Sequence, residues 1–325
     1  MARGHKPRAG SRGFWPKKRA ARIYPVLRNI PTTPKAQPLA FAAYKAGMAR
    51  VELTEKREES PMSGMDVVTP VTILEAPPLV VAGVTLLLRE TGIWREVKRA
   101  MAPKVSKDLS RKTNLPAKHK PYLEEIEKAV SSGGKYDIRL LVHTQPRAAF
   151  GKKKPELFEL PLGGKLDEKM AYAKSKLGGE IKADEVFTEG EMVDVSSVTT
   201  GKGYQGPVKR FGIKVRPRKH EKKRRHVGSL GPVTPRRVIP AKLAMPGQLG
   251  YQTRTEHNKL LLRIASGNAS PKGGFVNYGE VNGPHVILKG SVPGPRKRLI
   301  MLRKALRSNT VEKVEVKEIF LESQQ

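Results

Sequence analysis

The segment PLVVAGVTLLL, residues 78–88, contains the longest nearly uninterrupted apolar run of the chain and decides the fold class. The run covers ten residues, Leu79 to Leu88, whereas a membrane-spanning helix needs about 18 or more. Its Val content and its flanking Pro instead indicate a buried β-strand. Two segments of the same kind precede it, PLAFAAYKAGMA (38–49) and MDVVTPVTIL (65–74). Residues 38–88 therefore predict three β-strands.

The middle of the chain, from about 89 to 185, changes to a helical pattern. Apolar residues recur on one face from Pro121 to Gly133 and again over 166–177, which predicts two helices. Between them, YDIRLLVHT (136–144) predicts a buried strand. This part is expected to be a helical insertion.

Strand patterns return in the last part of the chain, at 191–199, 259–265, 285–289 and 313–317. Many short strands separated by Gly and Pro turns favour a barrel over a parallel sheet. The expected fold class is α+β, mainly β: a β-barrel interrupted by the helical insertion.

The net charge of +33 is concentrated in two blocks of the chain. Residues 1–50 hold twelve Lys or Arg and no acid, and residues 201–250 hold fourteen and a single acid, Glu221. These blocks carry +25 of the +33, so the other 225 residues are nearly balanced. The pattern predicts a globular body with two cationic segments that do not fold alone, because nothing in the chain neutralises them.

Such a charge requires a polyanionic partner, either a phosphate backbone or an anionic membrane surface. The chain has no Cys, which excludes disulfides and Cys-based metal sites and fits a reducing cytoplasm. No apolar stretch follows the basic N-terminus, so we expect no signal peptide. A chromatin-type DNA-binding protein remains an alternative, although no helix-turn-helix, zinc finger or basic zipper is visible.

Gly201–Gly206 (GKGYQG) has the spacing of a dinucleotide-binding loop. That motif requires a following apolar helix and an acid that ends a second strand. Here PVKRFG follows, and Glu221 lies within a basic run. The sequence also lacks a G-K-[ST] phosphate loop, a G-x-S-x-G elbow and an H-E-x-x-H metal motif. We therefore expect no enzyme, no cofactor and no metal site.

Phe14 and Trp15 interrupt the basic N-terminal run. Two interpretations have equal weight. The rings either anchor the segment to the body or stack on unpaired RNA bases.

Five segments resemble one protein family: HKPRAGSRGFWPKKRA (5–20), GKGYQGPVKRFG (201–212), GQLGYQTRTEHNK (247–259), GGFVNYGEV (273–281) and KGSVPGPRKRLIMLRKAL (289–306). Together they are similar to universal large-subunit ribosomal protein three in its archaeal and eukaryotic form. The match is specific because the blocks occur in order from end to end.

The resemblance implies a six-stranded translation-protein β-barrel with a helical insertion. It divides the chain into a basic extension (1–37), a first barrel part (38–200, insertion about 89–185), a basic loop (201–250) and a second barrel part (251–325). It also implies binding to large-subunit (23S-type) rRNA early in assembly, near the peptidyl transferase centre and the region where elongation factors dock. Neighbours would be large-subunit proteins fourteen and twenty-four e, in the cytoplasm.

Charge and resemblance together predict which residues contact RNA. In the extension these are Arg3, His5, Lys6, Arg8, Arg12, Trp15, Lys17, Lys18, Arg19 and Arg22. In the loop they are Lys202, Lys209, Arg210, Lys214, Arg216, Arg218, Lys219, His220, Lys222, Lys223, Arg224, Arg225, Arg236, Arg237 and Lys242. In the second barrel part they are Arg254, Arg296, Lys297 and Arg298.

The loop tip, with Ser229, Leu230 and Val233, is expected near the peptidyl transferase centre. Eukaryotic family members place a tryptophan there, whereas this chain has Leu230 nearest that position. His220 resembles a histidine that is methylated in some members, but its neighbours differ, so the modification is not carried over.

We predict that protease acting on the free protein trims residues 1–28 and cuts within 205–245, because neither region has core-forming periodicity. Bound rRNA should protect both. Limited proteolysis with and without rRNA measures this, and equal resistance in the two conditions would contradict the charge interpretation.

Overall fold

The computed structural model describes residues 11–56, 60–114, 122–131, 134–220, 222–231, 243–308, 310–312 and 315–322. The chain divides into two compact units. The body unit comprises Tyr24–Ser197 and Thr255–Gln325, and the arm unit comprises Met1–Ile23 and Val198–Arg254. Residues 24–37, expected in the basic extension, thus belong to the body unit.

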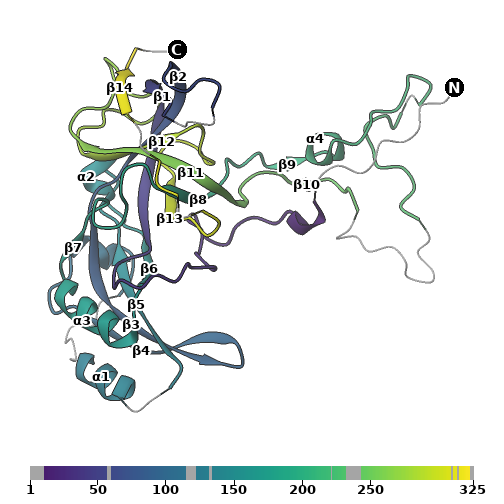
Figure 1. Cartoon of the computed structure of the whole chain (residues 1–325). Coiled ribbons are helices and arrows are strands. Elements are labelled where there is room, and N and C mark those ends of the chain that lie inside the picture. Colours follow the sequence, from purple (N-terminus) through teal and green to yellow (C-terminus); the bar gives the residue numbers. More distant parts are fainter. Residues whose placement is uncertain are drawn as a thin grey trace. The chain divides into compact units, whose positions relative to one another are not determined.

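The first sheet of the body is antiparallel in the pairings described and is built from strands far apart in the sequence (Figure 1). Its strands, in the described part of the chain, are β1 (Ala40–Thr54), β2 (Asp66–Glu75), β8 (Met192–Val198), β11 (Thr253–Ser266), β12 (Pro284–Lys289), β13 (Leu299–Lys304) and β14 (Glu315–Phe320). They neighbour one another in the order β13-β8-β11-β12-β2-β1-β14, and β13 also pairs with β1.

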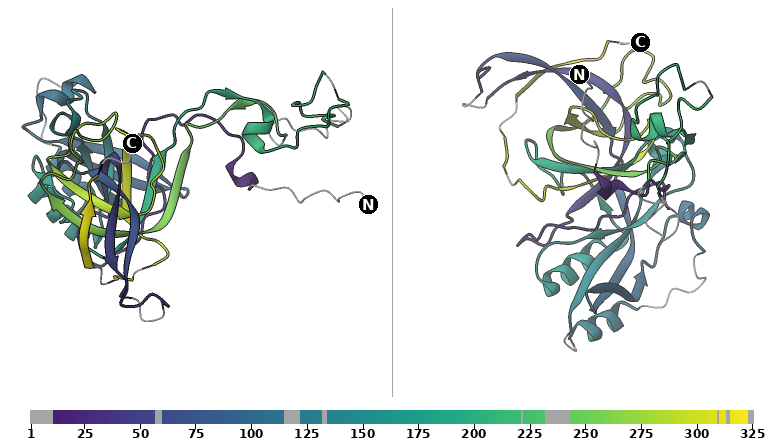
Figure 2. Two further views of the ribbon diagram at one scale, coloured as in Figure 1. Left: turned by 90° about the horizontal axis from the view of Figure 1, so that it is seen from above. Right: turned by 90° about the vertical axis from the view of Figure 1, so that its right-hand side faces the viewer.

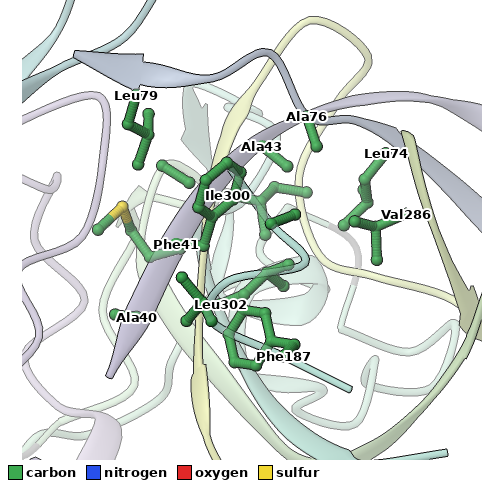
Figure 3. Packing of buried hydrophobic residues seen from close by; sticks show 14 of the residues in the cluster. Ala40, Phe41, Ala43, Leu74, Ala76, Leu79, Phe187, Val286, Ile300 and Leu302 are labelled. Atoms are coloured by element: carbon green, nitrogen blue, oxygen red, sulfur yellow. The ribbon is translucent and has the colours of Figure 1, made fainter. Parts of the chain in front are cut away.

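The inner side of this sheet forms the main core (Figure 3). Phe41 of β1 lies opposite Leu302 of β13 in the strand register and is fully buried. Ile300 and Phe187 pack close to it in the same cluster. Burial of each such side chain contributes about 1.5–3 kcal/mol, so the long apolar stretch of β1 is stable only when it is covered on both sides.

A second sheet forms the rest of the body. Its strands, among the described residues, are β3 (Leu79–Glu90), β4 (Ile93–Met101), β5 (Tyr136–His143), β6 (Leu157–Pro161) and β7 (Glu180–Ile181). The order is β4-β3-β5-β6, with β7 also pairing with β3. The central strand β3 is buried from Leu79 to Leu87 apart from Val80, as its apolar run predicts.

Two helices contact this sheet (Figure 2). They are α1 (Leu123–Ser131), which contacts β4, and α3 (Leu166–Lys176), which contacts β5. In α1, Ile126 is fully buried, and in α3, Met170 and Ala173 are buried. Glu168 caps the start of α3, where its carboxylate accepts a hydrogen bond of 3.2 Å from the Lys165 backbone N–H. Both predicted helices are confirmed.

Six described strands were not predicted. They are β4, β6 and β13, and the two-residue strands β7, β9 (Tyr204–Gln205) and β10 (Gly247–Gln248). Residues 89–185 were expected to hold two helices around one strand, β5, and the structure adds β4, β6 and β7 to that segment. β4 is an edge strand with a largely exposed face, so no apolar alternation marks it. β13 begins with a continuous apolar run, and such a run occurs both in strands and in buried helices, so it does not predict a strand. The remaining short elements are η2 (Lys107–Arg111) and α2 (Pro146–Phe150).

The other strand predictions are confirmed, with shifted ends. β1 continues to Thr54, beyond the predicted end at 49, because β2 and β14 both pair with its second half. The final predicted strand begins with residues 313–314, which lie outside the described residues, and β14 starts at Glu315. The body is mainly β with few helices.

An aromatic cluster connects the two sheets. The ring of Phe150 lies 4.9 Å from that of Tyr44 and 5.6 Å from that of Tyr278. The Tyr44 hydroxyl bonds to the Thr144 hydroxyl at 2.8 Å, and the Tyr278 hydroxyl donates to the buried carboxylate of Glu75. Burial raises the pKa of Glu75. The cluster thus holds strand ends of both sheets in contact.

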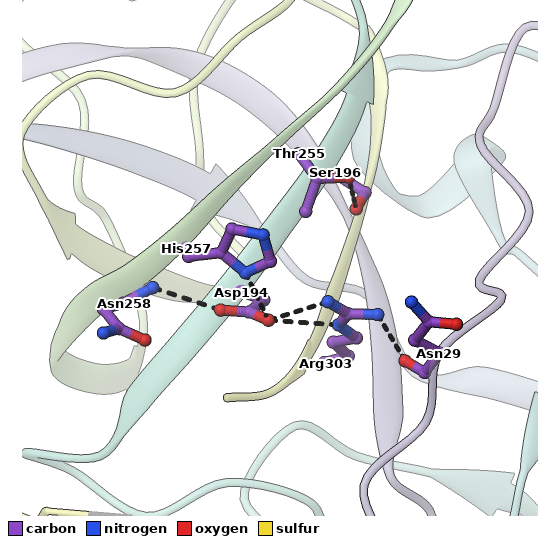
Figure 4. Close-up of polar contacts among 7 residues, drawn as sticks. All are labelled: Asn29, Asp194, Ser196, Thr255, His257, Asn258 and Arg303. Carbon is purple, nitrogen blue, oxygen red and sulfur yellow. Dashed lines mark hydrogen bonds and ion pairs between the residues drawn. The ribbon is translucent and has the colours of Figure 1, made fainter. Parts of the chain in front are cut away.

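A buried ionic network joins three strands of the first sheet (Figure 4). Asp194 of β8 lies opposite Arg303 of β13 and accepts two hydrogen bonds from its guanidinium, at 2.8 and 3.2 Å. The other contacts of Asp194 are to β11, with His257 Nδ1 at 2.9 Å and the Asn258 backbone N–H at 3.1 Å. Arg303 also donates to the carbonyl of Asn29.

Burial by itself raises the pKa of Asp194, but the hydrogen bonds from Arg303, His257 and Asn258 outweigh it and hold the pKa below its usual value. The stabilisation that follows is present above the ordinary Asp pKa of about 4 and is lost as the pH falls through the lower folded-state pKa.

We predict that Asp194→Asn lowers the free energy of unfolding by about 3 kcal/mol at pH 7, because Arg303 is left buried without its countercharge. The acid-induced loss of stability below pH 4 should become shallower. Chemical denaturation of the two proteins between pH 2 and 7 measures both effects. Asp184→Asn, at an exposed site without an ion pair to a described residue, is the control. An unchanged stability for Asp194→Asn would contradict the network's role.

Candidate nucleic-acid interface

In the arm unit, the segment that follows β8 and the segment that leads into β11 are joined by hydrogen bonds. The Thr199 backbone N–H donates to the Gln252 carbonyl at 3.0 Å, and the Thr199 hydroxyl accepts from the Gln252 N–H at 3.2 Å. Farther along, β9 (Tyr204–Gln205) pairs with β10 (Gly247–Gln248). Gly250 adopts a φ of +71°, and a side chain there would collide with the Thr200 carbonyl.

Arg210 holds the arm together from within. It lies in the short helix α4 (Pro207–Phe211), and its guanidinium donates only to carbonyls in the described structure. Nε donates to Gln248 at 3.0 Å, Nη1 to Met245 at 2.6 Å and Nη2 to Lys17 at 3.3 Å. The Lys17 ammonium donates in return to the Arg210 carbonyl at 3.0 Å. Arg210 therefore joins three separate chain segments, although the sequence predicted it as an RNA contact.

Trp15 packs inside the arm. Its ring lies 4.4 Å from that of Phe211, and the Lys17 ammonium lies 4.8 Å from the centre of the Phe211 ring. Phe14, in the single-turn helix η1 (Arg12–Phe14), remains 57% exposed, with the Arg254 guanidinium 4.7 Å from its ring centre. The two interpretations thus separate. Trp15 packs against Phe211 as the anchor interpretation expects, although within the arm rather than on the body, and Phe14 keeps an exposed ring beside Arg254.

The arm contains no Asp or Glu among its described residues. Its cations therefore have no carboxylate partner among the described residues of the arm. Burial lowers the pKa of Lys17, and the neighbouring charges of Arg254 and Arg210 lower it further. Burial likewise lowers the pKa of Arg210. The arm thus concentrates positive charge that an external anion must neutralise.

Most predicted RNA contacts in the described arm have exposed side chains. The exposed ones are Arg12, Lys18, Arg19, Arg22, Lys202, Lys209, Lys214, Arg218, Lys219, His220, Lys222, Lys223, Arg224 and Arg225. The partly buried ones are Trp15, Lys17, Arg210, Arg216 and Arg254. In the body unit, Arg296 and Lys297 are exposed and Arg298 is partly buried. Arg3, His5, Lys6, Arg8, Val233, Arg236, Arg237 and Lys242 lie outside the described residues.

The outer part of the loop forms a local turn. The Arg216 N–H donates to the Arg224 carbonyl at 3.1 Å, and the Arg224 guanidinium donates back to the Arg216 carbonyl at 3.3 Å. The tip beyond it exposes Leu230 to 39%. The Ser229 hydroxyl accepts from the Gly231 N–H at 3.4 Å, so the tip keeps a short turn of its own.

Tyr204 is a candidate that the sequence analysis missed. Its side chain is 75% exposed on β9, between the exposed Lys202 and Lys209. The signal in the sequence is an aromatic residue within a glycine-rich basic stretch, the same stretch that has the spacing of a dinucleotide-binding loop. The helix that follows this spacing, α4, has only five residues and ends at Gly212, so it does not meet the requirements of a dinucleotide site.

The described residues contain no cluster of three or more potential metal ligands. No helix in the described part of the chain is long and apolar enough to cross a membrane.

Comparison with known proteins identifies the family. The sequence model of the family described as Ribosomal protein L3 matches residues 1–324. This chain belongs to the ribosomal protein L3 family. It is 46% identical to the large ribosomal subunit protein uL3 of Methanothermobacter thermautotrophicus, over 95% of this chain and 94% of the relative. It is 45% identical to uL3 of Nanoarchaeum equitans (96% and 95%) and 43% identical to that of Methanobrevibacter smithii (95% and 94%). Ribosomal protein L3 proteins are structural and not enzymes.

We predict that Arg210→Ala loosens the arm without unfolding the body, because three carbonyl contacts are lost within the arm alone. Hydrogen exchange of the Lys202 and Leu249 amides, which bond across the β9–β10 pair, should accelerate about tenfold or more. Lys209→Ala removes an exposed neighbouring cation and should leave exchange unchanged. Equal exchange in both variants would show that Arg210 does not hold the arm.

Proposed function

We propose that this chain is a structural rRNA-binding protein of the large ribosomal subunit, in the cytoplasm, that binds 23S-type rRNA early in assembly. Membership of the ribosomal protein L3 family supports the assignment. The observation that carries the binding mechanism is the arm, in which exposed Lys and Arg side chains occur without a described carboxylate. Such a surface releases counterions when phosphates replace them, which makes binding favourable and salt-dependent.

The arm's internal geometry supports a division of roles. Arg210 and Trp15 fold the extension and the loop onto each other. The exposed cations of residues 214–225 are left to contact phosphates, while Phe14 and Tyr204 offer rings to unpaired bases. Hydrogen bonds from Arg210 to neutral carbonyls thus set the shape, and the exposed charges supply the affinity.

We further propose that the pairing of β13 with both β8 and β1 closes a six-stranded barrel of the translation-protein type. The proposed divisions of the chain remain a basic extension (1–37), two barrel parts (38–200 and 251–325) and a basic loop (201–250). The proposed neighbours are large-subunit proteins fourteen and twenty-four e, near the factor-binding region.

The salt dependence of rRNA binding tests this function. We predict that combining Lys222→Gln, Lys223→Gln, Arg224→Gln and Arg225→Gln weakens binding. The negative slope of log K against log salt should become shallower by about 3, since each phosphate contact contributes about 0.7–0.9 to its magnitude. Filter binding at several salt concentrations measures the slope. Duplex DNA as competitor should displace little RNA if rRNA is the partner.

The matched control removes four exposed lysines from the body unit that form no ion pair with a described residue. These are Lys104, Lys107, Lys128 and Lys182. Their replacement by Gln changes the net charge equally and should leave the slope nearly unchanged. Equal slopes for both quadruple variants would mean that net charge, rather than the arm, drives binding.

The loop tip is proposed to pack beside the peptidyl transferase centre and to support its geometry without taking part in the chemistry. We predict that Leu230→Ala subunits assemble normally but show altered aminoacyl-tRNA accommodation or altered sensitivity to peptidyl-transferase inhibitors. Occupancy in purified subunits and peptide-bond formation measure the two effects. Wild-type behaviour of Leu230→Ala in both measurements would make the tip a passive spacer.

A further inference from the structure

Strand β1 has a gap in its pairing. One edge pairs with β2 from Tyr44 to Thr54. The other pairs with β13 over Ala40–Tyr44 and with β14 over Arg50–Thr54 (Figure 1). Lys45 contacts the loop before β13 through backbone hydrogen bonds. Residues 46–49 have no strand partner on this edge among the described strands.

A cleft of about 580 Å³ opens beside this gap, within the body unit. Its walls come from β1, the 271–277 loop, the 294–296 loop and the residues that end and follow β14. Its apolar surface includes Met48, Phe275, Pro295 and Phe320. The volume lies within the range of pockets that enclose small organic groups.

The cleft is built with close packing on one side. The ring of Phe275 lies against Gly47, where a Cβ would come within 2.2 Å of the ring. The ladder between β1 and β2 shifts its register at the same place, between Lys45 and Gly47. Met48, by contrast, remains 45% exposed. The wall at Phe275 is therefore closely packed, whereas the polarisable side chain of Met48 is left partly uncovered by the described residues.

The polar groups of the cleft are mainly cationic. Lys45 donates only to carbonyls, those of Val292 at 2.6 Å and Gly294 at 3.2 Å, and burial lowers the pKa of its ammonium. Arg296 is exposed and forms no ion pair with a described residue. Asn277 has a φ of +60° and an exposed side chain whose amide makes no hydrogen bond to a described residue.

We propose that this cleft binds a single nucleotide of rRNA that is turned out of its stack, with the base between Met48 and the aromatic wall and the phosphate at Arg296. Single-stranded RNA is recognised by bases that stack on apolar and aromatic side chains and bond to amides. The site combines such a wall, the Asn277 amide, which makes no hydrogen bond to a described residue, and a cation at the start of the Arg296–Arg298 run. The inference rests on the proposed rRNA-binding function and adds a site outside the arm.

Charge favours a nucleotide over a peptide. A strand from another protein could pair with residues 46–49, but it would bring no countercharge for Arg296 unless it were acidic. Lys45 already donates to two carbonyls and is attracted by the carboxylate of Glu256. Glu322 is the single carboxylate among the lining residues, against these two cations. A nucleotide supplies a flat apolar group and one negative charge together, which matches both parts of the cleft.

The test uses the full-length protein, in vitro transcribed large-subunit rRNA and the variant Met48→Glu. A carboxylate at this exposed position leaves the core untouched and repels the phosphate from the cleft. We expect the variant to bind rRNA about tenfold more weakly, because one stacked base is lost. Chemical probing of the RNA bases should show one or two positions, protected by the wild type, that become reactive with the variant.

Val68→Glu is the matched control, because Val68 is 52% exposed on the neighbouring strand and does not line the cleft. It should bind within about twofold of wild type with an unchanged footprint. If the wild type binds rRNA and Met48→Glu binds with the same affinity and footprint, the proposal that the cleft binds a nucleotide is wrong. The proposed function is then unaffected. If Met48→Glu binds naked rRNA normally but is poorly incorporated into subunits, the occupant of the cleft is a protein segment and not a nucleotide. Failure of the wild type to bind rRNA would overturn both.

Discussion

The buried pair of Asp194 and Arg303 is the constraint on which the rest of the structure depends. It lies in register between β8 and β13, and Asp194 also holds His257 and Asn258 of β11. Because β8 leads into the arm unit and β11 begins at its end, the same carboxylate determines the register of both connecting strands. A shift of either strand by one residue would place its apolar side chains on the opposite face.

The two units hold their cations with different acceptors, carboxylates in the body and backbone carbonyls in the described part of the arm. In the body, carboxylates such as Asp137 and Glu156 each contact two cations, so the charges of the two signs offset each other locally. The described part of the arm has no carboxylate, and Arg210 therefore bonds to carbonyls instead. Neutral acceptors do not cancel the charge. The arm thus keeps a defined internal geometry and a full positive charge at the same time, which a phosphate-binding element needs.

The aromatic residues of the chain separate into internal and exposed groups. Trp15 with Phe211, and Tyr44 with Phe150 and Tyr278, hold pieces of chain together. Phe14, Tyr204 and the rim of the β1 cleft keep apolar surface in contact with solvent. Exposed apolar surface that lies beside unpaired cations is typical of a protein that completes its packing with RNA bases.

The sequence by itself determined the mainly β fold, both longer helices and the two cationic blocks, since apolar periodicity and charge are local properties. It also carried the family, through motifs such as GKGYQGPVKRFG. It did not separate Arg210 from its neighbours Lys209 and Lys214, because all three are cations in one basic stretch. The tertiary structure alone distinguished them, by bringing the carbonyls of residues 17, 245 and 248 to one guanidinium. The cleft at residues 46–49 likewise depends on where β13 and β14 end, and those ends are determined by pairing between distant segments.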